Sequence, residues 1–155
     1  PNSFVRTSFI VGHPNETEEM FEEMCDFARD FGFDRINVFS YSDEETTSAF
    51  DMENKISSEV IAQRADILGA ITDECMQKSL AQEIGKEIEL VIDGESDEHE
   101  YLLSARKTIW APDIDGEIYV NDRSVDKDLE FGIIYKAKVT ELVGNILTAT
   151  VDNSN

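Results

Sequence analysis

The chain has 155 residues, of which 34 are Asp or Glu and 13 are Lys or Arg, so its formal net charge is −21. The acidic excess is even: residues 1–82 carry 17 acidic and 6 basic side chains, and residues 83–155 carry 17 and 7. A protein that binds a phosphate backbone by itself normally needs a basic surface. The composition therefore disfavours RNA binding and favours a basic protein partner. An equally open interpretation is that the acidic residues serve only solubility.

The two cysteines, Cys25 and Cys75, lie far apart and lack CxxC spacing. They cannot form a disulfide scaffold or a self-contained thiolate metal site. Both occupy apolar positions of helical patterns, which predicts buried structural thiols. No stretch approaches the roughly 18 apolar residues of a membrane-spanning helix, and Pro1 to Arg6 lack the features of a signal peptide. We therefore expect a cytoplasmic protein.

The first element is a strand from Phe4 to Val11, rich in β-branched and aromatic residues. A turn at residues 12–15 leads into an amphipathic helix, capped either by a box of Asn15 and Glu18 or by Thr17, and ended by Gly32. A second strand, Ile36 to Tyr41, completes a βαβ unit and predicts parallel pairing. The apolar positions of the helix recur at three- and four-residue spacing: Met20, Phe21, Met24, Cys25, Phe27, Ala28 and Phe31.

A polar, acidic loop from Ser42 to Lys55 precedes a second helix of roughly 25 residues, which is long enough to connect two domains. Ser57 or Ser58 caps this helix and Gly85 ends it. Two parallel strands and two helices cannot close a sheet that is buried on both faces, so we expect further strands upstream of Pro1. The apolar set of the second helix is Val60, Ile61, Ile67, Leu68, Ile71, Cys75, Met76 and Leu80.

After Gly85 the pattern changes to short strands separated by turn residues, which predicts a small five-stranded β-barrel. The fold class is therefore α/β plus all-β, with an α/β piece at residues 1–82 and a barrel at residues 83–155. The strand candidates are Ile88 to Ile92, Tyr101 to Lys107, Ile118 to Asn121, Ile133 to Leu142 and Ile146 to Val151. The turns are Asp115-Gly116, Asn121-Asp122 and Gly144-Asn145, and the polar run Asp93 to Glu98 is a break.

Four features of the sequence have both a structural and a functional interpretation. His13 is better explained as part of a turn than as a base or ligand, and His99 as a solvated side chain. The lone Trp110 is more often a core residue, although it could stack on a partner beside Lys107. The run from Asp113 to Gly116 lacks the remaining ligands of a calcium loop and predicts a turn.

The turn at residues 12–17 joins a strand to a helix amino terminus, a place that suits a negatively charged ligand. Its spacing alone is weak evidence, but its context resembles the "RTTFIVGFPGET" block of radical-SAM methylthiotransferases. The resemblance covers nearly the whole chain. It comprises Arg6-Thr7-Ser8-Phe9-Ile10-Val11-Gly12-His13-Pro14-Asn15-Glu16-Thr17, Phe39-Ser40-Tyr41-Ser42, Glu44-Glu45-x-Thr47-x-Ala49, Ala105-Arg106-Lys107 and Ala111-Pro112-Asp113-Ile114-Asp115-Gly116.

Two branches of this family compete. The branch that modifies tRNA adenosines typically reads "YSPRPGT" where this chain has an acidic pair, Glu44-Glu45. The Ala-Pro-Asp-Ile-Asp-Gly block resembles the branch that methylthiolates the β-carbon of an aspartate in a basic small-subunit ribosomal protein. The net charge of −21 favours that protein substrate over tRNA. A free-standing acidic adaptor without enzymatic activity is a third hypothesis.

The resemblance implies that residues 1–82 are the last segment of a radical-SAM partial TIM barrel, and that residues 83–155 are an OB-like TRAM barrel. Relatives commonly use TRAM domains to bind RNA, a use that the acidic composition makes doubtful here. By resemblance the S-adenosylmethionine site includes Ile10, Val11, Gly12, Pro14, Phe39 and Tyr41. His13 stands where the family has Phe, and Asn15 where it has Gly; Asn tolerates a positive φ better than most residues.

The resemblance further implies two 4Fe–4S clusters, each held by three cysteines. The chain has neither cysteine motif, so we expect the isolated chain to be inactive and the longer protein to be the enzyme. A Cys-x-x-x-Cys-x-x-Cys motif upstream of Pro1 is the corresponding expectation, and no catalytic or metal-binding residue is assigned within the chain.

Overall fold

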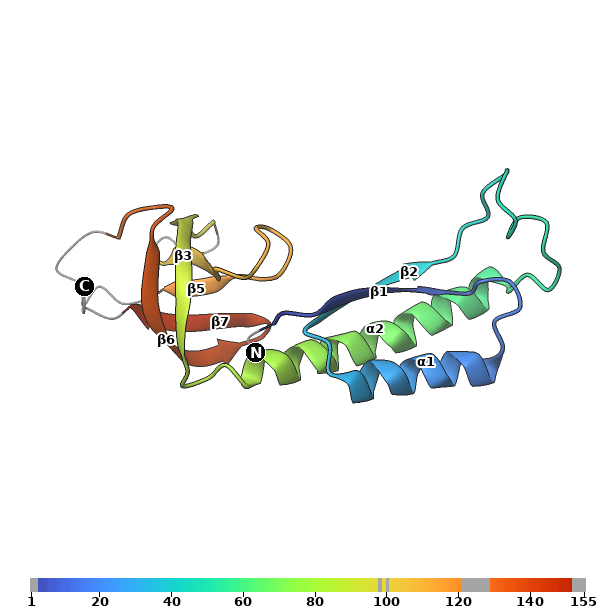
Figure 1. The fold of residues 1–155 in the computed structure, drawn as a ribbon, viewed down its shortest axis with the longest axis horizontal. Coiled ribbons are helices and arrows are strands. Elements are labelled where there is room, and N and C mark those ends of the chain that lie inside the picture. The colour runs from blue at the N-terminus through green and yellow to red at the C-terminus, as the bar shows by residue number, and fades with distance from the viewer. Residues whose placement is uncertain (1–2, 98, 100, 121–128, 152–155) are drawn as a thin grey trace. The chain divides into compact units, whose positions relative to one another are not determined.

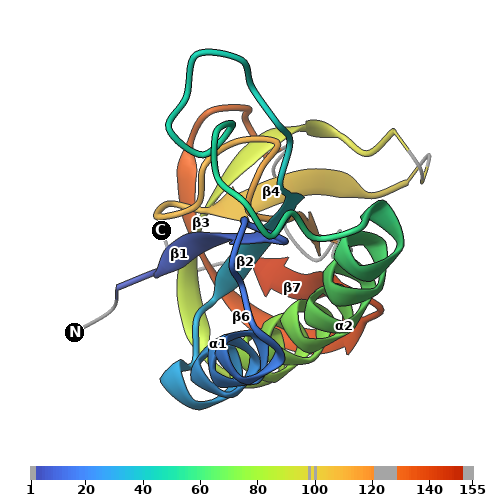
Figure 2. The same ribbon diagram turned by 90° about the vertical axis from the view of Figure 1, so that its right-hand side faces the viewer.

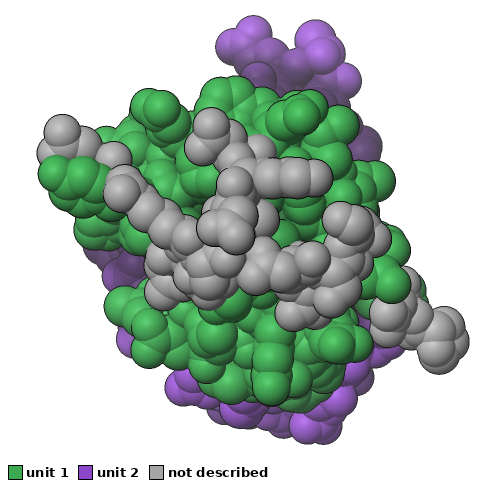
Figure 3. Space-filling model, turned by 90° about the vertical axis from the view of Figure 1, so that its left-hand side faces the viewer, with its two compact units in different colours: residues 1–4, 80–155 green, residues 5–79 purple. Residues whose placement is uncertain are grey.

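The computed structural model describes residues 3–97, 99, 101–120 and 129–151. The chain divides into two compact units, Val5–Ser79 and a second unit composed of Pro1–Phe4 and Leu80–Asn155, which are coloured separately in Figure 3. The division falls inside the last turn of helix α2 (Ser58–Ala81). In the part of the chain that is described, neither helix is long and apolar enough to cross a membrane.

The unit Val5–Ser79 is built on a parallel strand pair, β1 (Arg6–Val11) and β2 (Arg35–Ser40), joined by helix α1 (Glu18–Phe31). The predicted βαβ unit and its parallel pairing are therefore confirmed. Thr17 rather than Asn15 caps α1, because its side chain accepts a hydrogen bond from the amide of Met20 at 3.3 Å. Gly32 ends α1 in the left-handed region, as predicted.

Both helices lie on the same face of the two-stranded sheet (Figure 1), and Figure 2 shows this arrangement from the end of the helices. Odd-numbered β1 residues point toward the helices. The resulting core consists of Val11, Phe21, Cys25, Ala28, Leu68, Ile71 and Cys75, with Phe9, Met24, Ile36, Val38, Ile61 and Ala65 packed against it. Both thiols are buried, as predicted.

Within the described residues of this unit, no helix lies on the opposite face of the sheet (Figure 1). Ile10 and Phe39 lie on that face, with 56% and 54% of their surface exposed. Helix α1 also carries a second apolar stripe outside the core, formed by Met20, Phe27 and Phe31. Val60 and Ile67 of α2 are likewise exposed. The periodic apolar positions of α1 and α2 therefore include more residues than the core contains.

The second unit contains a β-barrel (Figure 1). The barrel is closed, with strand order β3-β4-β5-β7-β6. All neighbouring strands are antiparallel except β5 and β7, which are parallel. This confirms the predicted small barrel. The strands are β3 (Glu87–Glu95), β4 (Leu103–Lys107), β5 (Ile118–Val120), β6 (Ile134–Val143) and β7 (Ile146–Val151).

The predicted break after Ile92 is wrong, because β3 continues to Glu95. A bulge between Ile92 and Gly94 shifts the register, after which Gly94 pairs with Ser104 of β4. Such a bulge lets a strand keep its pairing while it bends. Gly144-Asn145 forms the predicted turn between β6 and β7, whereas the predicted turn at Asn121-Asp122 lies outside the described residues.

Alternating side chains of the strands fill the barrel, as the period of two requires. Trp110 is buried against Phe4, with ring centroids 6.0 Å apart, so it is a core residue. Asp115 is fully buried and its Oδ2 accepts a hydrogen bond from the amide of Ala111 at 2.6 Å, which explains residues 111–115 as a turn. His99 is exposed, as predicted. The barrel core includes Ile88, Leu90, Ile92, Ala105, Ile118, Val120, Ala137, Val139, Leu147, Ala149 and Val151.

Leu90 offers a test of this core, because its side chain is completely buried in the barrel. We expect Leu90→Ala to lower the free energy of unfolding of the barrel by about 2–5 kcal/mol, through lost burial and the cavity that remains. The emission of Trp110, the only tryptophan of the chain, reports unfolding of this unit during urea denaturation. Ile134→Ala is the matched control: Ile134 is 55% exposed, and an equal loss in both variants would contradict the barrel core.

Candidate functional site

The chain leaves β1 through a tight turn at residues 12–16. Gly12 has φ +83°, and its amide donates to both carboxylate oxygens of Glu16 at 3.0 and 3.1 Å. The amide of Glu16 in turn donates to the carbonyl of His13 at 3.0 Å. Glu16 is thus a structural residue of the turn, because its side chain accepts hydrogen bonds from the backbone amide at the start of the turn.

Asn15 lies in the left-handed region with φ 69°. Asn tolerates a positive φ better than most residues, so the residue type suits this position. The amide of Asn15 donates to the carbonyl of Asn54 at 3.2 Å. The side-chain amide of Asn54 donates back to the Oδ1 of Asn15 at 2.8 Å. The turn is therefore tied to the segment just before α2.

Arg64 of α2 holds the same turn from the side of the core. Its Nη1 donates to the Oε1 of Glu16 at 2.6 Å and to the carbonyl of Glu16 at 3.2 Å, and its Nη2 donates to Glu18 at 2.8 Å. Its guanidinium carbon lies 5.2 Å from the ring centroid of Phe21. Burial alone would lower the pKa of Arg64, but its hydrogen bonds to Glu18 and Glu16 outweigh burial and the pKa is raised.

Gly12 is required by space as well as by φ. A Cβ atom at Gly12 would lie 2.3 Å from Cγ1 of Ile61, which is one turn before Arg64 on α2. Two neighbouring positions of α2 therefore touch this turn, one through apolar contact and one through charge.

The six residues implied in cofactor binding separate into two groups. Ile10 and Phe39 are partners in the β1–β2 register and lie together on the open face of the sheet. Val11 is fully buried on the helix side, and its carbonyl accepts a hydrogen bond from the amide of Tyr41 at 2.8 Å. Pro14 is also buried.

The structure therefore brings Ile10, Phe39 and the Gly12 turn to one end of the sheet. It does not bring the side chains of Val11 and Pro14 to the open face. In parallel sheets this end, beyond the carboxyl ends of the strands, is where ligands commonly bind.

Tyr41 belongs to a charged cluster just beyond β2. Its hydroxyl donates to Asp43 at 2.7 Å, and Lys55 pairs with the same carboxylate and also donates to the carbonyl of Ala49 at 2.9 Å. The hydrogen bond to Asp43 raises the pKa of Tyr41, and Lys55 together with Tyr41 lowers the pKa of Asp43. The ring of His13 meets that of Tyr41 edge-on at 5.4 Å.

Within the described residues, no three His, Cys, Asp or Glu side chains are grouped as metal ligands. Cys25 and Cys75 are 5% and 6% exposed, and the thiol of Cys75 donates to the carbonyl of Ala28 at 3.4 Å. Burial raises the pKa of Cys25. Both thiols are thus engaged in the core of the α/β unit.

Sequence reasoning did not single out Arg64, Ile61 or Asn54. One signal was available: Arg64 falls three residues after Ile61 and four before Leu68, on the apolar side of α2. A charged residue on a buried helical face needs a partner of opposite charge. The partner, Glu16, is 48 positions away in the sequence, so only the tertiary structure identifies it.

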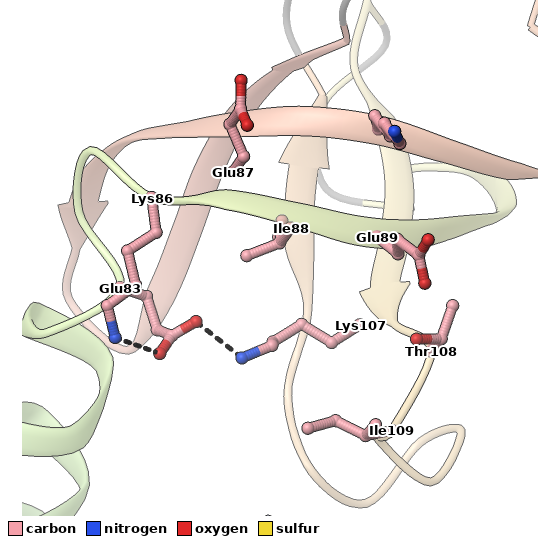
Figure 4. Close-up of a pocket in the computed structure, with 9 residues that line it drawn as sticks. Glu83, Lys86, Glu87, Ile88, Glu89, Lys107, Thr108 and Ile109 are labelled. Atoms are coloured by element: carbon pink, nitrogen blue, oxygen red, sulfur yellow. Dashed lines mark hydrogen bonds and ion pairs between the residues drawn. The ribbon is translucent and has the colours of Figure 1, made fainter. Parts of the chain in front are cut away.

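A separate pocket of about 410 Å³ opens on the barrel (Figure 4). At its edge the carboxylate of Glu83 binds Lys107 at 2.6 Å and Lys86 at 3.0 Å. Burial alone would raise the pKa of Glu83, but hydrogen bonds from these two lysines hold it below the ordinary value of 4.5. The residues lining the pocket are Glu83, Lys86, Glu87, Ile88, Glu89, Lys107, Thr108, Ile109 and Lys136.

The space around Gly12 can be tested by comparison with Gly32. Both have positive φ, but a Cβ atom at Gly32 would meet nothing within 4 Å. We expect Gly32→Ala to cost about 1 kcal/mol from backbone strain alone, and Gly12→Ala to cost at least about 2 kcal/mol more because of the clash with Ile61. Urea denaturation followed by circular dichroism measures both, and Ile61→Ala should recover part of the Gly12→Ala loss. Equal costs at the two glycines would contradict the close approach of α2.

Glu83 makes the stability of the barrel depend on pH. A carboxylate whose folded pKa is depressed contributes stability above its unfolded pKa, and this contribution is lost as the pH falls through the folded value. We expect Glu83→Gln to destabilise the barrel by about 1–2 kcal/mol at pH 7, and the difference from wild type to shrink as the pH falls below about 4.5. Denaturation followed by Trp110 emission at several pH values measures this. Glu87→Gln, at an exposed carboxylate of the same pocket, is the control; a pH-independent Glu83→Gln effect would contradict the assignment.

Comparisons with known proteins give a consistent family. Residues 84–151 match the TRAM domain. The chain is 68% identical over all 155 residues to "Ribosomal protein uS12 methylthiotransferase RimO" of Sulfurimonas denitrificans, and 59% identical over 153 residues to the protein of that name from Aliarcobacter butzleri. The alignments cover 100% and 97% of this chain, but 35% and 34% of the relatives.

A solved structure, the apo form of Mycoplasma genitalium RNase R, matches 72% of this chain and 20% of that chain with 16% identity and a TM-score of 0.35. A similarity this low carries no functional information. The sequence matches, by contrast, extend through the β1 turn, both helices and the barrel. The chain spans about a third of the length of the relatives it matches. Over its whole length its sequence is similar to part of the proteins named RimO, and its residues 84–151 match the TRAM domain.

Proposed function

We propose that this chain is the carboxy-terminal part of a radical-SAM enzyme that adds a methylthio group to the β-carbon of an aspartate in ribosomal protein uS12, in the cytoplasm. The observation that carries the proposal is the 68% identity over the whole chain to a protein named for this activity. The net charge of −21 supports a basic protein as the substrate, because tRNA would be repelled.

We propose that β1, α1, β2 and α2 are the last units of the radical-SAM partial barrel. The exposed stripe of Met20, Phe27 and Phe31 on α1 supports this, because such a stripe is normally covered by another element. Within the described residues β1 pairs only with β2, and its other edge would receive the preceding strand of the longer protein. The open face with Ile10 and Phe39 would then line the interior of the barrel.

In this proposal the open face is part of the S-adenosylmethionine site. Ile10 and Phe39 offer an exposed apolar surface suited to a flat ring, and Gly12 and Tyr41 lie at the adjoining end of the sheet. Gly12, Val11 and Pro14 act by fixing the backbone there. One 4Fe–4S cluster would supply the electron that cleaves the cofactor, and the second would take part in sulfur delivery. Their ligands belong to other parts of the longer protein, because Cys25 and Cys75 are buried in the helix–sheet core.

The barrel in this proposal docks the basic substrate and does not grip RNA. Two of its lysines, Lys86 and Lys107, are already bound to Glu83. Binding to RNA depends on basic side chains that can neutralise phosphates. The acidic excess of residues 83–155 supports a protein partner instead.

The test uses the full-length protein, reconstituted with iron and sulfide under anaerobic conditions and supplied with S-adenosylmethionine, a reductant and purified uS12. Mass spectrometry of uS12 is expected to show one added methylthio group on a single aspartate. Transfer to tRNA in place of uS12 would overturn the substrate assignment, and transfer to neither would overturn the enzymatic one. The 155-residue chain alone is the control, expected to be inactive and free of iron by analysis and visible absorption.

A further inference from the structure

We propose that Arg64 is a positioning residue of the cofactor site: through Glu16 it fixes the turn that follows β1 and thereby the end of the sheet at which S-adenosylmethionine is bound. The inference rests on the proposed function. It adds to it a residue of α2 that lies outside the motif blocks shared with the family.

Arg64 donates hydrogen bonds to Glu16 in the turn and to Glu18 at the start of α1. Nη1 binds the carboxylate and the carbonyl of Glu16, and Nη2 binds Glu18 in the first turn of α1. The side chains of Arg64 and Glu16 are only 7% and 9% exposed. Solvent screening is therefore weak at this pair, and the geometry of one partner is transmitted to the other.

Glu16 is the link between Arg64 and the backbone of the turn. One oxygen, Oε1, accepts from Arg64 at 2.6 Å and from the amide of Gly12 at 3.0 Å. Loss of the arginine would leave a nearly buried carboxylate without its cation. A buried carboxylate without a cation is unfavourable, so the Glu16 side chain moves toward water and its hold on the Gly12 amide weakens.

Stability by itself does not explain a buried ion pair at this position. Replacing such a pair by apolar residues of similar volume is often neutral or stabilising, because removing two charges from water is costly. The adjacent helix position, Ile61, already packs on the turn through apolar contact. The arginine adds a constraint on orientation, because its planar guanidinium donors fix how the Glu16 carboxylate is oriented.

The turn also needs such a constraint. Gly12 and Asn15 both have positive φ, and conformations of this kind persist only where the surroundings hold them. Gly12 directly follows Val11 and is two residues after Ile10, whose side chain lies on the open face beside Phe39. Movement of the turn would therefore shift the edge of the proposed site without disturbing the core behind it.

The experiment compares Arg64→Gln, Arg64→Lys and Glu16→Gln in the full-length, cluster-loaded protein. We expect Arg64→Gln to raise the KM for S-adenosylmethionine about tenfold, with a smaller change in kcat, because misplacement of a positioning contact costs binding geometry. Arg64→Lys keeps the charge but not the fork and should recover only part of the loss. The double variant Arg64→Gln/Glu16→Gln should be no worse than the worse single variant, because both act through one contact.

A second readout does not depend on activity. Hydrogen–deuterium exchange of Arg64→Gln should show faster exchange in the peptide that carries Gly12 to Glu16, while the peptides of β2 and of the α2 segment around Leu68 keep their wild-type exchange. Arg29→Gln is the matched control, since Arg29 forms an exposed ion pair with Asp26 in the same unit at 3.2 Å. It should change neither readout.

The outcomes separate this inference from the proposed function. An unchanged KM together with unchanged exchange at the turn would overturn the role of Arg64 while wild-type activity stands. Faster exchange spread over the whole unit, with kcat and KM reduced in parallel, would assign Arg64 to stability alone and also overturn it. If wild type neither binds S-adenosylmethionine nor modifies uS12, the proposed function fails, and the cofactor role of Arg64 fails with it. Should Arg64→Gln not fold, Arg64→Lys and Glu16→Gln decide by the same two readouts.

Discussion

The hydrogen bonds from Arg64 to Glu16 and from Gly12 to Glu16 are the contacts on which the turn after β1 depends. They connect three elements that are distant in the sequence: the end of β1, the start of α1 and the middle of α2. The local sequence patterns predict each strand and each helix separately. The apolar core packs these elements together, and the Glu16 carboxylate is the point at which hydrogen bonds join the end of β1 to α2.

In the described part of the chain, the two-stranded sheet of this unit has one face covered by helices and one face without a helix. Helices α1 and α2 cover the sheet on the side of Val11, where both cysteines are buried. On the other side, Ile10 and Phe39 are more than half exposed. Because exposed apolar pairs are unfavourable in water unless something covers them, this asymmetry supports the proposal that the sheet belongs to a larger barrel and binds a ligand on its inner side.

The barrel solves a different physical problem. Its five strands close on themselves, so it has no free strand edge to be covered. It compensates an acidic surface locally, as Glu83 shows by holding two of the few lysines. The proposed function assigns the docking of a basic protein to this closed, acidic module, and part of the S-adenosylmethionine site to the α/β unit.

The sequence by itself determined the element types and their order. The period of two in residues 88–92 and the three- and four-residue spacing in α1 depend on local geometry, and so do the Gly32 end of α1 and the Gly144-Asn145 turn. Motif spacing determined the family, and composition determined the charge. The carboxyl end of β3 could not be predicted from the sequence, because a bulge at Gly94 lets the strand continue through polar residues that resemble a loop.

Only the tertiary structure decided which apolar residues reach the core and which polar residues meet. Met20, Phe27 and Phe31 share the period of the buried residues of α1 but lie outside the core, because periodicity does not specify how much of a helix a neighbour covers. Val11 and Ile10 are adjacent in the motif yet face opposite sides of the sheet. The pairing of Arg64 with Glu16 spans 48 positions, and no local pattern encodes a contact that exists only once α2 has packed beside the turn.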